Sequence, residues 1–176
     1  METGAPAGEP LQCDAVVQAA TFSPDGTRIA AGDLSGAIRL WDVATRRVVG
    51  DFAPGGRNTA AAAYSEDAKL LVVAGERGEV RLWDTATFRL DRTLRVAERD
   101  LDSLALTRDG SRIAVSANRK VTVLEARTGR VVTTIETDLL SSSALVFSPD
   151  GKRLLHVGGG TVRKKGEEER RVTVQL

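Results

Sequence analysis

Few residues in this sequence have the types and spacing that catalysis or metal binding needs. His156 is the only histidine and Cys13 is the only cysteine. A nucleophile–histidine pair would have to use His156, and a zinc site would need further His or Cys ligands beside it. His156 stands between the apolar residues Leu155 and Val157, which favours a half-buried strand residue over a general base or a metal ligand. We therefore predict a non-enzymatic protein with no metal and no cofactor.

The glycine-containing motifs also lack the residues that would make them binding sites. The run Gly158–Gly160 is followed by no Gly-Lys-Ser/Thr sequence and by no helix signal, so a phosphate-binding loop is not expected. Asp-Gly pairs begin at Asp25, Asp109 and Asp150, but the alternating acidic ligands of a calcium loop are missing around them. We interpret these pairs as hairpin turns and the triple glycine as a flexible connection between strands.

Composition and charge narrow the class of protein further. The chain has 176 residues, of which 41% are hydrophobic and 28% charged, as in an ordinary globular domain. Its 25 basic and 24 acidic residues give a net charge of +1, so no overall field draws it to nucleic acid or to an anionic membrane. A single cysteine excludes an internal disulfide and suits a reducing compartment, and residues 1–10 contain no apolar run of the signal-peptide kind. We expect a cytoplasmic protein with a flexible leader at residues 1–12.

A repeat of nearly constant length organises the rest of the chain. Four openings, each an aromatic residue or Leu followed by a turn sequence, are 42, 42 and 41 residues apart. The first two copies close on Trp-Asp. The repeat positions are Phe22, Tyr64, Leu106 and Phe147 at the openings, and Trp41, Asp42, Trp83 and Asp84 at the closes. A period of about 40–45 residues that closes on Trp-Asp is typical of β-propeller blades, which have four strands each.

Each copy repeats the same order of strand and turn signals, which we label a, b, c and d. In the first and fourth copies the turn after strand a contains Pro24 or Pro149, which presets φ, and Gly26, Gly110 and Gly151 tolerate positive φ. Ala60–Ala63 would favour a helix by propensity, but the segment is too short for a stable helix and the repeat places strand a there. The predicted strands are a at 16–22, 59–64, 101–106 and 144–147, b at 28–32, 69–74, 112–116 and 153–157, c at 37–41, 80–83 and 121–124, and d at 47–52, 89–95 and 130–136.

The stretches FSPDGTRIAAGDLSGAIRLWDVATRRVVGDF and YSEDAKLLVVAGERGEVRLWDTAT resemble WD40 repeats of the degenerate, bacterial type. The resemblance extends over roughly residues 13–176 and implies an all-β fold of four propeller blades, each of four antiparallel strands, in a ring that is not complete. The implied blades cover about 13–53, 54–96, 97–137 and 138–176. It also implies that the tryptophans plug the spaces between blades.

The hydrogen-bonded tetrad that often surrounds this tryptophan in the family is missing. Ala31 and Val73 stand where the resemblance would place Ser or Thr, and Ser35 and Arg77 stand where it would place Asp. No histidine precedes strand a. We therefore expect the indole N–H groups of the two tryptophans to find other acceptors.

The predicted strands do not close a ring. Four complete blades need sixteen strands, and the fourth copy supplies no strand d. We place its strand c at 171–175, after an inserted loop at 159–170, which leaves this strand as an edge that can pair with another strand. Three interpretations stay open: a fragment of a larger propeller, which we prefer, an open arc completed by another chain, and a homodimer of two half rings.

The resemblance places the d–a and b–c loops on one face, usually the face that binds a partner. Four arginines, Arg57, Arg77, Arg99 and Arg119, fall on these loops, together with Leu139 and Leu140. One hypothesis is that the arginines grip an acidic peptide while the two leucines, expected to be exposed, anchor it. Ordinary loop charge is the simpler interpretation.

Function is expected to follow the class of fold. Our leading prediction is a non-catalytic scaffold that binds a protein or peptide, with no nucleic acid and no membrane as partner. The alternative is a regulatory or targeting fragment of a larger multidomain protein, such as a kinase or ATPase with a C-terminal WD40 array. A propeller hydrolase or lyase is weaker, because strand a offers mainly Ala, Val and Ser rather than acids or histidines.

Overall fold

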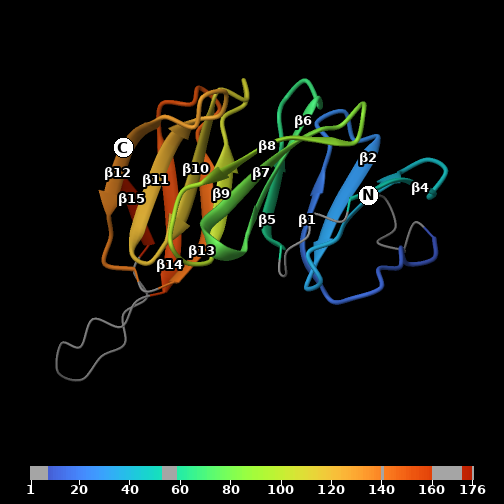
Figure 1. Ribbon diagram of the computed structural model, residues 1–176, viewed down its shortest axis with the longest axis horizontal. Coiled ribbons are helices and arrows are strands. Elements are labelled where there is room, and N and C mark those ends of the chain that lie inside the picture. Colours follow the sequence, from blue (N-terminus) through green and yellow to red (C-terminus); the bar gives the residue numbers. More distant parts are fainter. Residues whose placement is uncertain (1–7, 53–58, 140, 160–171, 176) are drawn as a thin grey trace, which may run out of the picture.

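Four antiparallel sheets make up the chain in a computed structural model that describes residues 8–52, 59–139, 141–159 and 172–175 (Figure 1). We call the sheets blades 1 to 4. Blade 1 contains β1 (Val17–Phe22), β2 (Arg28–Asp33), β3 (Ile38–Asp42) and β4 (Val48–Phe52), and blade 2 contains β5 (Thr59–Tyr64), β6 (Leu70–Gly75), β7 (Glu79–Asp84) and β8 (Arg89–Arg95). Blade 3 contains β9 (Ser103–Leu106), β10 (Arg112–Ala117), β11 (Lys120–Glu125) and β12 (Val131–Glu136), and blade 4 contains β13 (Ser141–Phe147), β14 (Leu154–Gly159) and β15 (Val172–Gln175).

The strands of each blade pair in sequence order, as the all-β propeller prediction requires. A short 3-10 turn, η1 (Glu76–Gly78), joins β6 to β7. The alanine run is strand β5, so its position in the repeat overrides its helix propensity. In blade 4, β15 pairs with β14 in an antiparallel ladder in which Val174 lies opposite Leu155, and this pairing confirms the predicted strand c. Among the described residues β15 has no neighbour on its other side.

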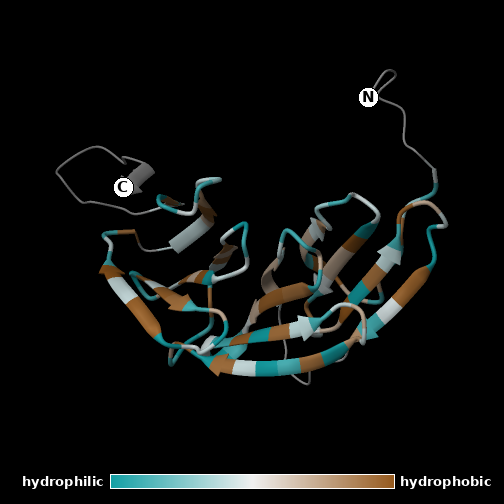
Figure 2. Cartoon of the chain, turned by 90° about the horizontal axis from the view of Figure 1, so that it is seen from above, coloured by the Kyte–Doolittle hydropathy of each residue, from teal (hydrophilic) through white to brown (hydrophobic). Residues whose placement is uncertain are grey.

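The blades follow one another along an open arc, with blade 1 at one end and blade 4 at the other (Figure 2). The innermost strand of each blade, β1, β5, β9 or β13, contacts the innermost strand of the next blade. Each blade is therefore a separate hydrogen-bonded unit that is held to its neighbours by side-chain packing rather than by a shared sheet.

Three apolar clusters fill the spaces between consecutive blades, because successive residues of a strand face opposite sides of its sheet. In blade 2, Val72 packs toward blade 3, whereas Val73 and Trp83 pack toward blade 1. The Trp83 ring lies 4.8 Å from the ring of Phe52, centroid to centroid, so this tryptophan plugs the space between two blades as expected. The expectation that its indole N–H finds another acceptor is wrong, because Nε1 is buried and has no hydrogen-bond partner among the described residues.

The turns between strands a and b have one repeated construction. In blade 2, the Ser65 hydroxyl donates to Asp67 Oδ1 at 2.7 Å and accepts the Leu70 amide at 3.0 Å, while Asp67 also accepts the Lys69 amide at 3.1 Å. The same arrangement is built by Ser23 with Asp25, Thr107 with Asp109, and Ser148 with Asp150. The predicted Asp-Gly hairpin turns are confirmed, and their first hydroxyl is a partner that the sequence analysis did not identify.

The aspartates of the Trp-Asp closes hold the turn between strands c and d. Asp42 Oδ1 accepts the amide and the hydroxyl of Thr45, both at 2.7 Å. Asp84 accepts the amide of Thr87 at 2.7 Å and its hydroxyl at 2.8 Å. These hydrogen bonds favour the ionised carboxylate, so the pKa of each aspartate lies below its ordinary value.

The first blade presents an uncovered face at one end of the arc. Tyr64 and Phe147, the aromatic residues that end strand a in blades 2 and 4, pack into the clusters shared with the preceding blade. Phe22 holds the same position in blade 1, where it is 62% exposed. Among the described residues, no preceding blade covers Phe22 as one covers its counterparts.

The last blade presents an uncovered face at the other end. Ala105 lies between blades 3 and 4 and is 6% exposed, whereas Val146, its counterpart in blade 4, is 52% exposed. Ala114 is fully buried, but the corresponding Leu155 is only half-buried. Both ends of the arc therefore expose side chains that pack against another blade elsewhere in the molecule.

The triple glycine belongs partly to a strand rather than to a connection. Gly158 and Gly159 are the last residues of β14, which corrects the prediction of a flexible loop beginning at Gly158. A Cβ atom at Gly158 would come within 2.0 Å of the Ser141 carbonyl oxygen, so only glycine lets β13 approach this closely. Gly159, where the predicted insertion at 159–170 begins, is thus part of β14, and residues 160–170 lie outside the described residues.

Candidate interaction surface

The b–c and d–a loops of blades 2 and 3 form one connected surface. Backbone hydrogen bonds join Val96 N to the Gly78 carbonyl at 2.8 Å and Leu101 N to the Gly75 carbonyl at 3.3 Å. The Asp100 carboxylate accepts the Arg77 amide at 2.8 Å. Gly78 has φ +69°, and a Cβ atom there would lie 2.0 Å from the Ala97 carbonyl oxygen. The two loops thus hold each other in place through their main chains.

Three of the four predicted arginines lie in the described part of the chain, and all three are on these loops. Arg77 follows β6, Arg99 lies between β8 and β9, and Arg119 joins β10 to β11. Each is exposed, and none of their guanidinium groups has a hydrogen bond or an ion pair with the described residues. Arg57 lies outside the described residues, and its place in this surface stays a prediction.

Two of these arginines occupy a backbone conformation that L-residues rarely adopt. Arg77 has φ 56° and Arg119 has φ 60°, and Asn118 beside it has φ 48°. The left-handed region costs a residue with a Cβ atom roughly 1 kcal/mol, which glycine avoids. Positive φ is not confined to this surface, because Arg46, Ala68 and Phe88 adopt it in turns at the other end of the blades. What distinguishes Arg77 and Arg119 is that their guanidinium groups are exposed and have no partner among the described residues.

A pocket of about 220 Å³ opens between the loop before β9 and the hairpin joining β10 to β11. Its lining is apolar within and charged at the rim. The apolar side chains are Val96, Ala97, Val115 and Ala117, and the polar ones include Glu98, Arg99, Asn118 and Lys120. Glu98 pairs with Arg95 at 3.3 Å and Lys120 pairs with Glu136 at 3.5 Å, whereas the Arg99 head group has no partner among the residues that the structure describes. The pocket could hold one aliphatic side chain beside an acidic group.

The predicted leucine anchor is wrong for Leu139. This side chain is 3% exposed and lies against the strand β14, where one of its methyl groups would be 3.2 Å from a Cβ atom at Gly158. An apolar residue next to a glycine-containing strand buries itself in the space that the missing side chain leaves. Leu140 lies outside the described residues. The pocket between blades 2 and 3 was not predicted, because its walls come from two segments that are apart in the sequence, residues 96–99 and residues 115–122.

His156 is buried between blades 3 and 4, on the side of β14 that faces β10. It is 6% exposed, and neither ring nitrogen has a hydrogen-bond partner among the described residues. Burial lowers the pKa of His156, an effect that Asp102 partly opposes. The Ser116 hydroxyl on β10 is also buried without a described partner. These groups are packed between blades rather than gathered in an open cleft, as the interpretation of a strand residue predicted.

The described residues were also searched for a metal site and for a membrane-spanning helix, and neither was found. No three His, Cys, Asp or Glu side chains there come together in a way that could hold a metal ion. No described helix has the length and apolar character to cross a membrane.

Blades of four antiparallel strands, arranged along an arc with apolar clusters between them, define a β-propeller architecture. A family model matches this chain at residues 11–42, which comprise most of blade 1, and it is the WD40 family described as "WD domain, G-beta repeat". Residues 11–42 thus match a WD40 repeat, as the sequence motifs indicated, and the remaining blades repeat the same architecture. A search of curated proteins found no sequence match.

Two solved structures illustrate the likeness of the fold. The structure of U3-55K matches with a TM-score of 0.75 and 18% identity, over 84% of this chain and 47% of that one. The crystal structure of the RRP9 WD40 repeats matches with the same TM-score and identity, over 84% of this chain and 46% of that one. The present chain therefore spans about half the length of the structures it matches. At this identity the likeness concerns the fold alone.

Proposed function

We propose that this chain is a non-catalytic interaction module that binds an acidic peptide segment of a partner protein on the b–c and d–a loops of blades 2 and 3. WD40 repeats generally serve as protein-interaction scaffolds and are generally non-catalytic. The observation that carries the proposal is the set of three exposed arginines, Arg77, Arg99 and Arg119, without partners among the described residues. Arginines whose guanidinium groups were already paired within the fold would not be available to bind a ligand.

Charge and shape together suggest the class of peptide. Free guanidinium groups form bidentate, charge-assisted hydrogen bonds with carboxylates, which supports acidic residues in the ligand. The apolar pocket beside Arg99 favours an aliphatic residue next to them. This pocket replaces the leucine anchor of the original hypothesis, since the apolar side chain would come from the partner. Such a peptide would combine one buried anchor with a surrounding set of charged contacts.

Peptide selection followed by charge reversal tests this proposal. We expect the chain to select acidic peptides containing an aliphatic residue from a random display library. The double variant Arg99→Glu/Arg119→Glu should weaken binding of a selected peptide at least tenfold, which corresponds to about 1.4 kcal/mol. Reversal of two arginines far from these loops, Arg47→Glu/Arg89→Glu, provides the control with the same change of net charge. Equal loss in both variants, or selection of peptides without acidic residues, would contradict the proposal.

The uncovered faces of blades 1 and 4 support a second proposal about assembly. Phe22 at one end and Val146 and Leu155 at the other expose apolar surface that neighbouring blades cover elsewhere. We propose that further blades complete the propeller. They would belong to a longer protein, in which this segment is a regulatory or targeting part beside a domain such as a kinase or ATPase, or to a second copy of this chain.

Light scattering separates these two sources of the missing blades. A uniform dimer would support a ring of two half propellers, and its mass should fall to that of a monomer in the variant Phe22→Glu. Monomers with weak unfolding cooperativity, or aggregates, would support the fragment of a longer protein. The single cysteine supports a cytoplasmic location, which fractionation of the producing cells would test.

A further inference from the structure

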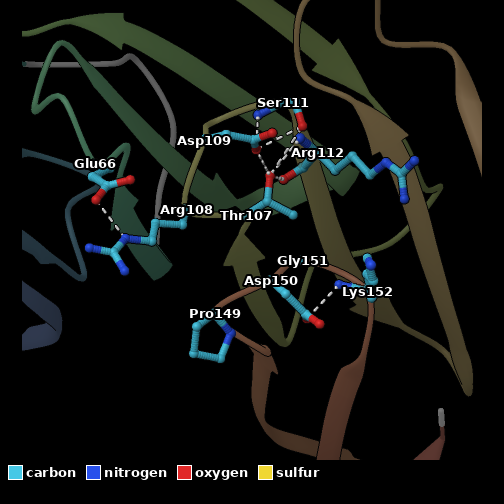
Figure 3. Close-up of a pocket in the computed structure, with 10 residues that line it drawn as sticks. All are labelled: Glu66, Thr107, Arg108, Asp109, Ser111, Arg112, Pro149, Asp150, Gly151 and Lys152. Carbon is cyan, nitrogen blue, oxygen red and sulfur yellow. Dashed lines mark hydrogen bonds and ion pairs between the residues drawn. The ribbon is translucent and has the colours of Figure 1, made fainter.

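The opposite end of the blades, where strands a and b are joined, carries a second hollow. It has a volume of about 370 Å³ and is lined by the a–b turns of blades 3 and 4 and by Glu66 from the turn of blade 2 (Figure 3). Because a–b turns and b–c loops lie at opposite ends of strand b, this hollow is separate from the proposed peptide surface. We propose that it binds a phosphate group, through the side chains of Arg112 and Lys152.

The walls of the hollow are fixed before any ligand arrives. The Glu66 amide donates to the Arg108 carbonyl at 3.1 Å, and Arg108 Nε donates to Glu66 Oε1 at 2.6 Å. These two contacts join the turns of blades 2 and 3, and the contact between the side chains is drawn in Figure 3. On the other side, Asp150 holds its own turn by accepting the Lys152 amide at 3.0 Å. A ligand would therefore not have to order a loop, and only the exposed side chains of Arg112 and Lys152 would lose conformational freedom.

Two cations of the hollow have head groups without a partner. The side chains of Arg112 and Lys152 are exposed, and neither has an ion pair or a hydrogen bond with the described residues. Arg108, the third cation, is occupied by Glu66. Two free cations that line one hollow can neutralise a phosphate dianion, which carries about −1.5 to −2 charges at pH 7.

The same repeat position in blade 1 shows what such an arginine does when the fold uses it. Arg28 corresponds to Arg112, and its guanidinium donates to the Thr85 carbonyl of the next blade at 3.1 Å. Arg112 makes no such bond and lines the hollow instead. The difference between these two arginines leaves Arg112 free for a ligand, whereas Arg28 joins two blades.

The acids of the hollow are held by the turns. Asp109 Oδ1 accepts the Ser111 amide at 3.0 Å and the hydroxyls of Thr107 and Ser111, at 2.7 and 2.8 Å. Asp150 Oδ1 accepts the Ser148 hydroxyl at 2.5 Å. Formal charges in the lining balance, so the site would gain its affinity from short contacts with the two free cations and not from long-range attraction.

Calorimetric titration of the whole chain tests the site. The ligands are inorganic phosphate, O-phosphoserine, a short phosphoserine peptide, and the same peptide with Glu in place of phosphoserine. We expect phosphate and both phosphoserine ligands to bind, and the Glu peptide to bind at least tenfold more weakly. Phosphate bound as tightly as the phosphopeptide would indicate a site for the free ion, and tighter binding of the phosphopeptide would indicate a modified protein as the source; both results support the site.

Variants connect the binding to the two cations. Arg112→Ala/Lys152→Ala should lose phosphate binding at least tenfold, while Arg47→Ala/Arg89→Ala, with the same loss of charge, should keep it. Circular dichroism checks that both variants are folded. No phosphate binding by the unaltered chain, or equal loss in both double variants, would overturn the proposal. The outcome is independent of the peptide surface, because Arg99→Glu/Arg119→Glu should leave phosphate binding unchanged.

Discussion

The two ends of the blades are built in different ways. At the a–b turns, four copies of one Ser/Thr–Asp arrangement have hydroxyl-to-carboxylate distances of 2.5 to 2.7 Å, and the hydroxyl residue is buried in blades 1 to 3. At the b–c loops of blades 2 and 3, Arg77 and Arg119 leave their head groups without partners among the described residues. Repetition at one end indicates a contribution to folding, and irregularity at the other indicates a contribution to binding.

Removal of one turn hydroxyl should have the largest effect on stability. Ser65→Ala takes away the group that donates to Asp67 and accepts the Leu70 amide, in a residue that is almost fully buried. We expect the free energy of unfolding to fall by about 1–3 kcal/mol, because the Leu70 amide loses its partner. Urea denaturation measures the change. Affinity for the selected peptide should stay the same, and a tenfold loss of affinity would contradict the separation of the two ends.

The turn carboxylates should make stability sensitive to strong acid. Hydrogen bonds from the Ser111 amide and from the hydroxyls of Thr107 and Ser111 lower the pKa of Asp109 to about 2. A folded-state pKa below the unfolded value contributes stability that is present above about pH 4 and is lost as the pH falls toward 2. Asp109→Asn should therefore flatten the loss of unfolding free energy between pH 4 and 2. An unchanged slope would show that Asp109 does not carry this dependence.

A second, milder loss should occur at higher pH, because of His156. Burial lowers its pKa in the folded chain, so the unfolded chain takes up a proton first as the pH falls through about 6.5. Stability should then decline below about pH 6.5, until the folded-state pKa is reached. His156→Leu should remove this decline and leave the loss between pH 4 and 2 in place. Thermal unfolding of both proteins at pH 7.5, 6.5 and 5.5 measures the difference.

Relief of strain in the b–c loop of blade 3 should have the smallest effect on the free energy of unfolding. It should raise this free energy, whereas Ser65→Ala lowers it. Arg119→Gly places at φ 60° a residue that tolerates this conformation, so the free energy of unfolding should rise by about 0.5–1 kcal/mol. Arg127→Gly, at an exposed position outside this surface, provides the comparison. If Arg119→Gly destabilised the chain as much as Arg127→Gly, the positive φ would not be a source of strain.

The regular parts of the molecule followed from local sequence. The spacing of the Trp-Asp closes and the aromatic openings predicted fifteen strands, and the strand at Val172–Gln175 came from its likeness to the start of β11. The exposed arginines were also predicted, since loop position and charge are local properties. The repeat was strong enough to override helix propensity at β5.

The features that failed or were missed depend on contacts between distant segments. Leu139 was expected at the surface, but a glycine in β14 leaves the space that buries it. The pocket beside Arg99 arises between a d–a loop and the next b–c hairpin. The unpartnered Trp83 N–H and the positive φ of Arg77 depend on side-chain and backbone geometry that residue types alone do not set.

The most direct test of the central claim is the dissociation constant of a selected acidic peptide for Arg77→Gly/Arg119→Gly, measured by calorimetry beside the unaltered chain. The account predicts binding at least tenfold weaker in a protein that is equally or more stable, because the strained arginines serve the ligand and not the fold. An unchanged dissociation constant would contradict it, and the loop arginines would then be ordinary surface charge.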